Sequence, residues 1–200
     1  MKGRELLIRY KSSFEAGCDE AGRGSLMGPV FAAAVILPDD FPFSVLGDSK
    51  KLTPQQRERA RILIEKYAIS WAVATADHHE IDEINILNAS ILAMHRALSQ
   101  LKPPPDLILV DGNRFKNFQD IPHECFIKGD GILAAIAAAS ILAKTHRDEF
   151  VVKLHDQFPQ YGWASNKGYA TRLHVEAIHR WGYSPFHRKS FHLNMQLKLF

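Results

Sequence analysis

Short, continuous apolar runs recur along the 200 residues and are separated by polar or glycine-containing segments. Such a run predicts a buried strand, because a strand covered on both faces has no polar side to alternate with. The runs cover residues 14–18, 29–37, 69–76, 107–110 and 124–128. The pattern therefore predicts five strands.

Between these runs, apolar residues recur at helical spacing. The helices predicted in this way cover residues 54–67, 86–101, 131–158 and 171–181. Thr53 and Gln56 form a capping-box pattern around Pro54, which marks where the first helix begins. The order of strands and helices predicts an α/β fold, a mixed β-sheet flanked by helices.

The length and the 46% hydrophobic composition suit one compact unit with a substantial core. Within it we expect a catalytic core over residues 1–158 and a C-terminal helical extension over residues 159–200. The extension begins with a segment rich in glycine and aromatic residues, 159–170. This segment and the tail are expected to carry substrate recognition.

The net charge of +3 and the pI near 8.9 permit a polyanionic partner without requiring one. Cys18 and Cys125 lie in strand-like runs without C-x-x-C spacing, which favours reduced core thiols over a disulfide. The first ten residues contain scattered charges and no continuous apolar core of the kind found in a secretory signal. The uncharged stretch 131–143 is shorter than the ~20 residues that span a membrane. We therefore expect a cytoplasmic protein with no membrane partner.

Acidic residues stand where three of the predicted strands end. Asp19 and Glu20 follow the first strand, Asp111 follows 107–110, and Asp130 follows 124–128. If these strands are neighbours in the sheet, their terminal carboxylates meet at one edge. Converging carboxylates need a cation, and Mg²⁺ and Mn²⁺ prefer carboxylate oxygens. The pattern thus favours a metal site suited to phosphodiester hydrolysis.

Two considerations weigh against this reading. Successive residues of a regular strand point to opposite faces, so Asp19 and Glu20 must lie at the strand's end or at a bulge. Any single strand-end acid is more often a solvated turn residue, and short motifs match by chance. Only the combination of acids supports a metal site.

Glycines at 22, 24 and 28 follow the first two acids and allow the backbone to approach a ligand closely. Their spacing is similar to a dinucleotide-binding fingerprint. However, Pro29 and an apolar strand follow where the phosphate-binding helix should begin, which argues against that function. His78, His79 and His187 lack H-E-x-x-H spacing, so we expect most histidines to be surface or capping residues.

Seven segments, taken in order along nearly the whole chain, resemble the ribonuclease HII family. They are residues 19–24 (DEAGRG), 48–52 (DSKKL), 110–112 (VDG), 128–130 (KGD), 137–144 (AAASILAK), 167–169 (KGY) and 187–191 (HRKSF). The resemblance implies an RNase H-like fold with a C-terminal helical extension. It also implies a ribonuclease H, an endonuclease that hydrolyses the RNA strand of RNA–DNA hybrids. Members of the family also cut 5′ of single ribonucleotides embedded in duplex DNA, leaving 3′-hydroxyl and 5′-phosphate ends.

By position, the resemblance makes Asp19, Glu20, Asp111 and Asp130 the catalytic, metal-binding carboxylates. The implied cofactor is Mn²⁺ or Mg²⁺ in a two-metal mechanism. Asp148 is a rival for the fourth place. Asp130 is favoured because it follows a strand as the other acids do, whereas Asp148 lies far along a predicted helix.

The resemblance also implies a substrate-binding set. Gly22, Arg23 and Gly24 would sense the ribose 2′-hydroxyl, and Tyr169 would complete the pocket against the sugar. Further candidates, chiefly for phosphate contacts, are Lys50, Lys51, Lys167, Arg188 and Ser190. The simpler alternative for Tyr169 is a loop aromatic that caps a core. The simpler alternative for the basic residues is a set of solvated loop cations.

The final residues, Gln196 to Phe200, resemble the short peptides with which bacterial replication proteins dock on the sliding clamp. The alternative is an amphipathic end folded on its own domain. Two other functions also compete: a noncatalytic hybrid-binding module and a Mg²⁺-dependent nucleotide phosphatase. The four acids argue against the first. Tyr169 and the glycine turn argue against the second, since a mononucleotide enzyme has no need to sense ribose within a duplex.

Overall fold

The computed structural model describes residues 6–12, 14–47 and 52–191. Its strands are β1 (Glu15–Ala21), β2 (Val30–Ile36), β3 (Ser70–Ala76), β4 (Leu107–Asp111) and β5 (His123–Phe126). Its α-helices are α1 (Pro54–Tyr67), α2 (His78–Leu98), α3 (Ala134–His155), α4 (Trp163–Asn166) and α5 (Arg172–Trp181). Its short 3-10 helices are η1 (Phe43–Val45), η2 (Gly129–Gly131) and η3 (Pro159–Tyr161).

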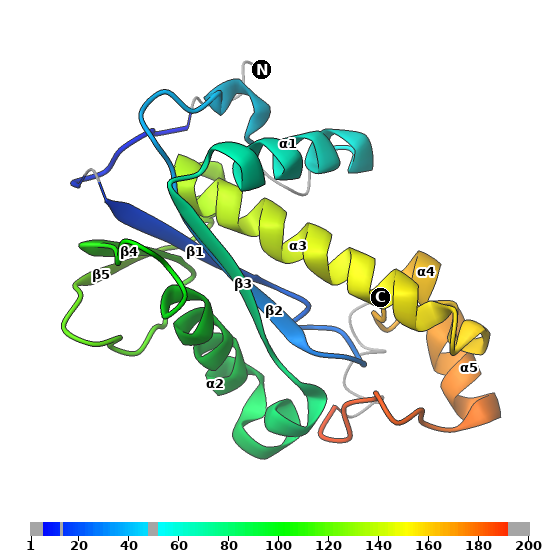
Figure 1. Ribbon diagram of the computed structural model, residues 1–200. Helices are drawn as coiled ribbons and strands as arrows, with labels where there is room; N and C mark the ends of the chain where they lie inside the picture. The colour runs from blue at the N-terminus through cyan, green and yellow to red at the C-terminus, as the bar shows by residue number, and fades with distance from the viewer. Residues whose placement is uncertain (1–5, 13, 48–51, 192–200) are drawn as a thin grey trace.

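The five strands form one mixed sheet in the order β3-β2-β1-β4-β5. β1 lies at its centre, antiparallel to β2 and parallel to β4, and β5 is parallel to β4. Helices α1 and α3 cover one face and α2 covers the other, while α4 and α5 lie beyond the end of α3 (Figure 1). The predicted fold class, a mixed sheet flanked by helices, is confirmed.

Helix α3 lies unusually close to β1. It begins with a run of small residues, and the whole stretch from Ala134 to Ala143 is buried. A Cβ atom added at Gly17 of β1 would stand 2.0 Å from the carbonyl carbon of Ala135. The helix backbone therefore rests directly on the strand backbone, an approach that only glycine at this position permits.

Helix α2 differs from the prediction, which began it at residue 86. Its first part starts at His78, where Asp77 and Glu80 form a capping box, and ends at Asn85, whose φ is 65°. The Asn85 side chain then accepts a hydrogen bond from the Leu87 amide (3.0 Å) and caps the second part. The opening turns are largely polar, so hydrophobic periodicity did not reveal them.

The C-terminal segment packs against the first strands. Leu26 and Met27, from the β1–β2 connection, share one hydrophobic cluster with Val151 of α3 and Val175 of α5. The last described residues run from α5 back beside the start of α2 (Figure 1). There Asp82 accepts hydrogen bonds from the amides of residues 189 and 190, both at 2.9 Å. A division near residue 158 stays a prediction.

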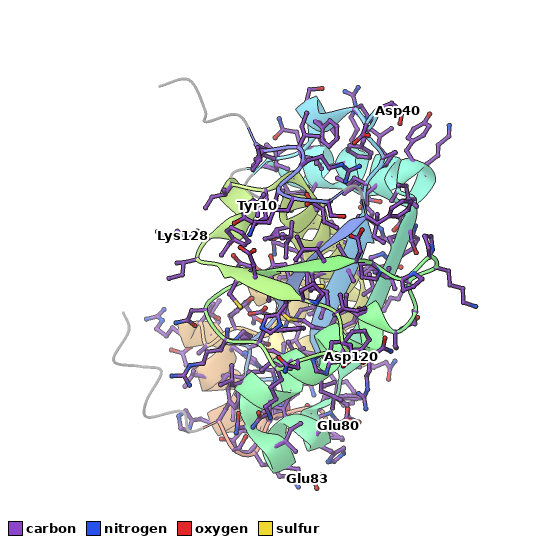
Figure 2. The ribbon with its side chains drawn as sticks, turned by 90° about the vertical axis from the view of Figure 1, so that its left-hand side faces the viewer. Tyr10, Asp40, Glu80, Glu83, Asp120 and Lys128 are labelled. Atoms are coloured by element: carbon purple, nitrogen blue, oxygen red, sulfur yellow. The ribbon has the colours of Figure 1, made fainter. Side chains whose placement is uncertain are left out.

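The N-terminal segment covers part of the β5 edge, where Figure 2 labels Tyr10. The Tyr10 hydroxyl donates to Glu124 (2.7 Å), and its ring meets Phe126 edge-on. Such cover protects an edge strand from pairing with another chain. Both cysteines are free, as predicted, but Cys125 is exposed on this edge strand, so the prediction of two core thiols holds only for Cys18.

Several predictions cannot be compared with the structure. Lys50, Lys51 and the segment Gln196 to Phe200 lie outside the described residues. In the part of the chain that is described, no helix is both long and apolar enough to cross a bilayer.

The contact between α3 and β1 makes a stability prediction. Gly17→Ala should lower the free energy of unfolding by about 3 kcal/mol or more, because backbone atoms cannot move aside for the new methyl group. For a chain of this size that is a fall in Tm of roughly 6–12 °C. The control is Gly131→Ala, where a Cβ meets no atom within 4 Å. Equal melting temperatures for the two variants would contradict the packing described.

Candidate active site

The parallel direction of β1, β4 and β5 brings their C-terminal ends to one edge of the sheet. The pairing of β1 with β4 ends at Cys18 opposite Val110, and Asp19 and Asp111 are the next residues along the two strands. Their carboxylates therefore lie side by side where the two strands part. The predicted convergence at strand ends rests on this parallel register.

Asp19 and Glu20 do point to opposite faces of the sheet. Asp19 forms a hydrogen bond with Ser140 of α3, whereas Glu20 reaches a cavity of about 300 Å³ that is lined partly by α2. β1 contains no bulge here, because Asp19 pairs with Ala33 and Glu20 with Ala32 in a regular antiparallel ladder. Asp19 and Glu20 thus lie beyond the last residue of β1 that pairs with β4, but they still pair with β2.

A second cavity, of about 370 Å³, unites the acids with the glycine turn. Its lining residues are Asp19, Glu20, Ala21, Gly22, Arg23, Gly24, Asp111, Ser140, Lys144, Arg147, Asp148 and Tyr169. Glu20 and Asp111 line both cavities. The opening between β1 and β4 therefore gives one ligand access to acids on both faces.

Burial and mutual repulsion act on the acids. Asp19 is only 6% exposed; burial, and then the charges of Glu20 and Asp111, raise its pKa well above the usual range. Burial also raises the pKa of Glu20, although Arg23, whose Nη1 lies 3.1 Å from Glu20 Oε1, acts in the opposite direction. The Asp19 carboxylate is further held by the Glu20 amide, at 2.6 Å.

This donor set fits a hard divalent cation. It consists of carboxylate oxygens, and a cation would relieve both the repulsion and the burial of charge. Across the described residues, no three acidic, histidine or cysteine side chains already stand together in a ligating arrangement. Asp19, Glu20 and Asp111 nevertheless share one cavity, which is the requirement for joint coordination.

The two candidates for a fourth acid occupy different positions. Asp130 lies in η2, beyond the end of β5, and is 4% exposed; the neighbouring Gly129 amide donates to Asp111 Oδ1 at 2.7 Å. Asp130 is not among the residues that line the larger cavity, whereas Asp148 is. Asp148 is paired with Lys144 at 3.2 Å. The choice of Asp130 stays a prediction.

The glycine turn and Tyr169 form facing walls of the larger cavity. Ser25 and Tyr169 form an antiparallel bridge, and the Leu26 amide donates to the Gly168 carbonyl at 2.8 Å. Tyr169 remains 40% exposed, and a Cβ added at Gly24 would stand 3.9 Å from its ring. The structure thus brings together the turn and the aromatic ring, which lie far apart in the sequence.

The candidate phosphate contacts differ in accessibility. Arg23 is half exposed at the cavity. Lys167 Nζ donates to the carbonyl of Ala164 at 2.6 Å, and the Ser190 hydroxyl donates to Asp82. Arg188 is fully buried, with its guanidinium bound to backbone carbonyls. The prediction that Arg188 contacts phosphate therefore disagrees with this structure, in which packing buries the Arg188 side chain.

Sequence reasoning gave no role to several lining residues of α3. Ser140, Lys144 and Arg147 follow one another at spacings of four and three, so they share one face of a helix whose first half is otherwise apolar. That interruption of the apolar pattern was the available signal. Arg114, which lines the smaller cavity from the loop after β4, carried no comparable signal.

A mixed five-stranded sheet with an acidic site where its parallel strands end defines an RNase H-like nuclease. The family model described as Ribonuclease HII matches residues 16–194. The chain therefore belongs to the ribonuclease HII family, and it is a ribonuclease H, a hydrolytic endonuclease of the family that cleaves the RNA of RNA–DNA hybrids.

Curated relatives agree over almost the whole chain. A ribonuclease HII of Christiangramia forsetii is 62% identical over 178 residues, covering 89% of this chain and 90% of the relative. A ribonuclease HII of Phocaeicola vulgatus is 57% identical over 190 residues, covering 94% of each.

Solved structures share the fold. Ribonuclease H2 from Pyrococcus horikoshii OT3 superposes with a TM-score of 0.73 at 25% identity, covering 92% of this chain and 97% of that one. The PCNA:RNase HII complex from Archaeoglobus fulgidus gives 0.74 at 24% identity, covering 90% and 95%. Bst-RNase HIII in complex with Mn²⁺ gives 0.71 at 17% identity, covering 92% and 69%.

The turn makes a second prediction. Gly22 has a φ of +93°, and a Cβ there would stand 2.1 Å from Arg147 Nε, so Gly22→Ala should destabilise the protein by about 2–4 kcal/mol. Gly24→Ala is the matched control, two residues away, where the nearest atom is at 3.9 Å. Its free energy of unfolding should stay within about 0.5 kcal/mol of the wild type. Denaturant unfolding measures both, and a Gly22→Ala variant as stable as Gly24→Ala would refute the close contact.

Proposed function

We propose that this protein is a divalent-metal-dependent endonuclease that hydrolyses the RNA strand of RNA–DNA hybrids and cuts 5′ of single ribonucleotides embedded in duplex DNA. The products would carry 3′-hydroxyl and 5′-phosphate ends. One observation supports this most strongly: three of the proposed metal ligands, Asp19, Glu20 and Asp111, line the same cavity as the Gly22–Gly24 turn and Tyr169. A hydrolytic centre and a candidate ribose sensor thus lie within reach of one nucleotide. We also propose a cytoplasmic location, where such duplexes arise.

The residues that would hold Mn²⁺ or Mg²⁺ are Asp19, Glu20, Asp111 and, as the fourth, Asp130. When bound, a pair of such ions activates water and stabilises charge at the attacking and leaving oxygens of a phosphodiester. The chain's own part is to fix its carboxylates in place. Asp19 is fixed by Ser140 and by the Glu20 amide, and Asp111 by the Gly129 amide.

Substrate selection is assigned to the backbone of the turn and to Tyr169. A backbone without side chains at residues 22 and 24 can reach a 2′-hydroxyl, which distinguishes RNA from DNA. The partly exposed ring of Tyr169 can lie against the sugar from the other side. Arg23, Lys167 and the two lysines at 50 and 51 are proposed to contact phosphates, which position a duplex without reading its sequence.

The test of this function uses a duplex with one embedded ribonucleotide, incubated with Mg²⁺ or with Mn²⁺. The same duplex made entirely of DNA is the control, and a uniform RNA–DNA hybrid is the third substrate. We expect cleavage of the hybrid and a single cut 5′ of the embedded ribonucleotide, mapped by product length and end chemistry. Equal cutting of the all-DNA duplex would refute the proposed specificity.

The fourth acid is decided by two isosteric variants in the same assay. Asp130→Asn should lower kcat by about 10²–10³, since losing a metal ligand removes several kcal/mol of transition-state stabilisation. Asp148→Asn should keep kcat within about tenfold, because Asp148 is already paired with Lys144. Thermal unfolding of both variants shows whether each is folded. A larger loss of kcat in Asp148→Asn than in Asp130→Asn would make Asp148 the fourth metal-binding carboxylate.

A sliding clamp is proposed as a partner of the segment Gln196 to Phe200. Two features support this: the likeness of the segment to clamp-docking peptides, and the solved complex of an archaeal RNase HII with PCNA. Deletion of residues 196–200 should weaken binding to a bacterial sliding clamp at least about tenfold, if apolar side chains in a pocket supply the affinity. Cleavage of a short duplex should be unchanged. Undiminished clamp binding by the shortened protein would exclude this partner site.

A further inference from the structure

Two arginines are buried beneath the recognition turn. Arg147 and Arg188 are 2% and 0% exposed, which is rare for this residue type. Within the described residues, neither has a carboxylate oxygen within ion-pair distance, and Arg147 Nε and Arg188 Nη2 have no hydrogen-bond partner. Burying an unpaired guanidinium is costly, so a side chain of this kind calls for an explanation beyond filling space.

Arg147 joins the turn to the Tyr169 loop. Its Nη2 donates to the Lys167 carbonyl at 3.0 Å, and its guanidinium carbon lies 5.4 Å from the centre of the Tyr169 ring. Its Nε and Cδ lie directly beneath Gly22, in the space that a Cβ atom there would fill. One side chain thus supports the backbone of the turn and both the carbonyl and the ring that face it.

Arg188 holds the same turn from the other end. Its Nη1 donates to the Arg23 carbonyl and its Nε to the Gly28 carbonyl, both at 2.9 Å. Its own amide donates to the Leu26 carbonyl, also at 2.9 Å. The C-terminal segment is therefore attached to the β1–β2 connection at three points around the recognition turn.

We propose that Arg147 and Arg188 form a buried brace that fixes the spacing between the Gly22–Gly24 turn and Tyr169, and that Arg147 is a positioning residue for ribose selection at the cleavage junction. This deepens the proposed function and rests on it. Arginine suits the task because its planar fork reaches carbonyls in two directions, whereas lysine carries a single point charge. Neither arginine needs to contact the substrate.

The brace should affect rate more than binding. A displacement of about 1 Å in a positioning group can lower a rate by up to ~10²-fold. Binding of a duplex depends instead on phosphate contacts spread over its length, which a small shift of the turn leaves in place. The embedded ribonucleotide presents a single ribose to the turn, so its cleavage should respond more strongly than cleavage of a uniform hybrid.

The experiment compares Arg147→Lys and Arg147→Met with the wild type. The matched control is Arg96→Lys, since Arg96 on α2 also donates to a backbone carbonyl, that of Thr75, and pairs with Glu80 away from the cavity. Two quantities are measured in each protein. They are the hydrogen exchange of the Leu26 amide, which bridges to Gly168, and kcat and KM on the embedded-ribonucleotide duplex and on the hybrid.

We expect faster Leu26 exchange in both Arg147 variants and not in Arg96→Lys. We also expect kcat on the embedded ribonucleotide to fall at least about tenfold more than kcat on the hybrid, with KM nearly unchanged. Unchanged exchange, or an equal loss on the two substrates, would overturn the brace. Failure of both variants to fold would overturn it too, because Arg147 would then be a core element.

The two levels of the proposal can fail separately. If the wild-type protein does not cut at an embedded ribonucleotide, the proposed specificity fails, while the exchange of the Leu26 amide still shows whether Arg147 ties the turn to the Tyr169 loop. If the wild type cuts there and both Arg147 variants retain its ratio of rates, the proposed specificity stands and the positioning role fails.

Discussion

The candidate active site depends on where the parallel pairing of β1 and β4 ends. The two strands part after Cys18 and Val110, and the next residue on each is an aspartate. Had the pairing continued, these side chains would have lain within a closed ladder against α3. Because it stops, the buried Asp19 carboxylate and the partly buried Asp111 carboxylate stand beside that of Glu20 at an opening of the sheet, and their mutual repulsion favours a cation there.

Helix α3 supports both the core and the site. At its start, small residues allow its backbone to lie against Gly17. Further along, the same helix presents Ser140 to Asp19 and Arg147 to the turn at Gly22. Since one rigid helix carries both contacts, the acids and the turn proposed to sense ribose are held at a fixed distance by the packing that stabilises the fold.

The sequence was informative where physical rules are local. Continuous apolar runs predicted all five strands, the capping box at Thr53 is present, and strand-end acids at 19, 20 and 111 share one cavity. The interrupted start of α2 escaped prediction because its first turns are polar and Asn85 restarts the helix. The exposure of Cys125 escaped it because a short apolar run does not show which strand lies at an edge.

Burial of individual cations was also beyond the reach of the sequence. The family resemblance made Arg188 a candidate phosphate contact, yet tertiary packing encloses its side chain completely. Arg147 attracted no prediction, although it lies next to the turn on which recognition is proposed to depend. Which arginine faces solvent is set by contacts between segments more than a hundred residues apart, and one sequence read alone does not contain them.

The central claim is that the acids at the parting of β1 and β4 act together on a divalent ion. The most direct test is a crystal structure of the wild-type protein from crystals grown with Mn²⁺. Anomalous scattering would locate the metal. We predict an anomalous peak within ~2.3 Å of carboxylate oxygens from Asp19, Glu20 and Asp111. Mn²⁺ bound elsewhere, with these three carboxylates free of metal, would contradict the account.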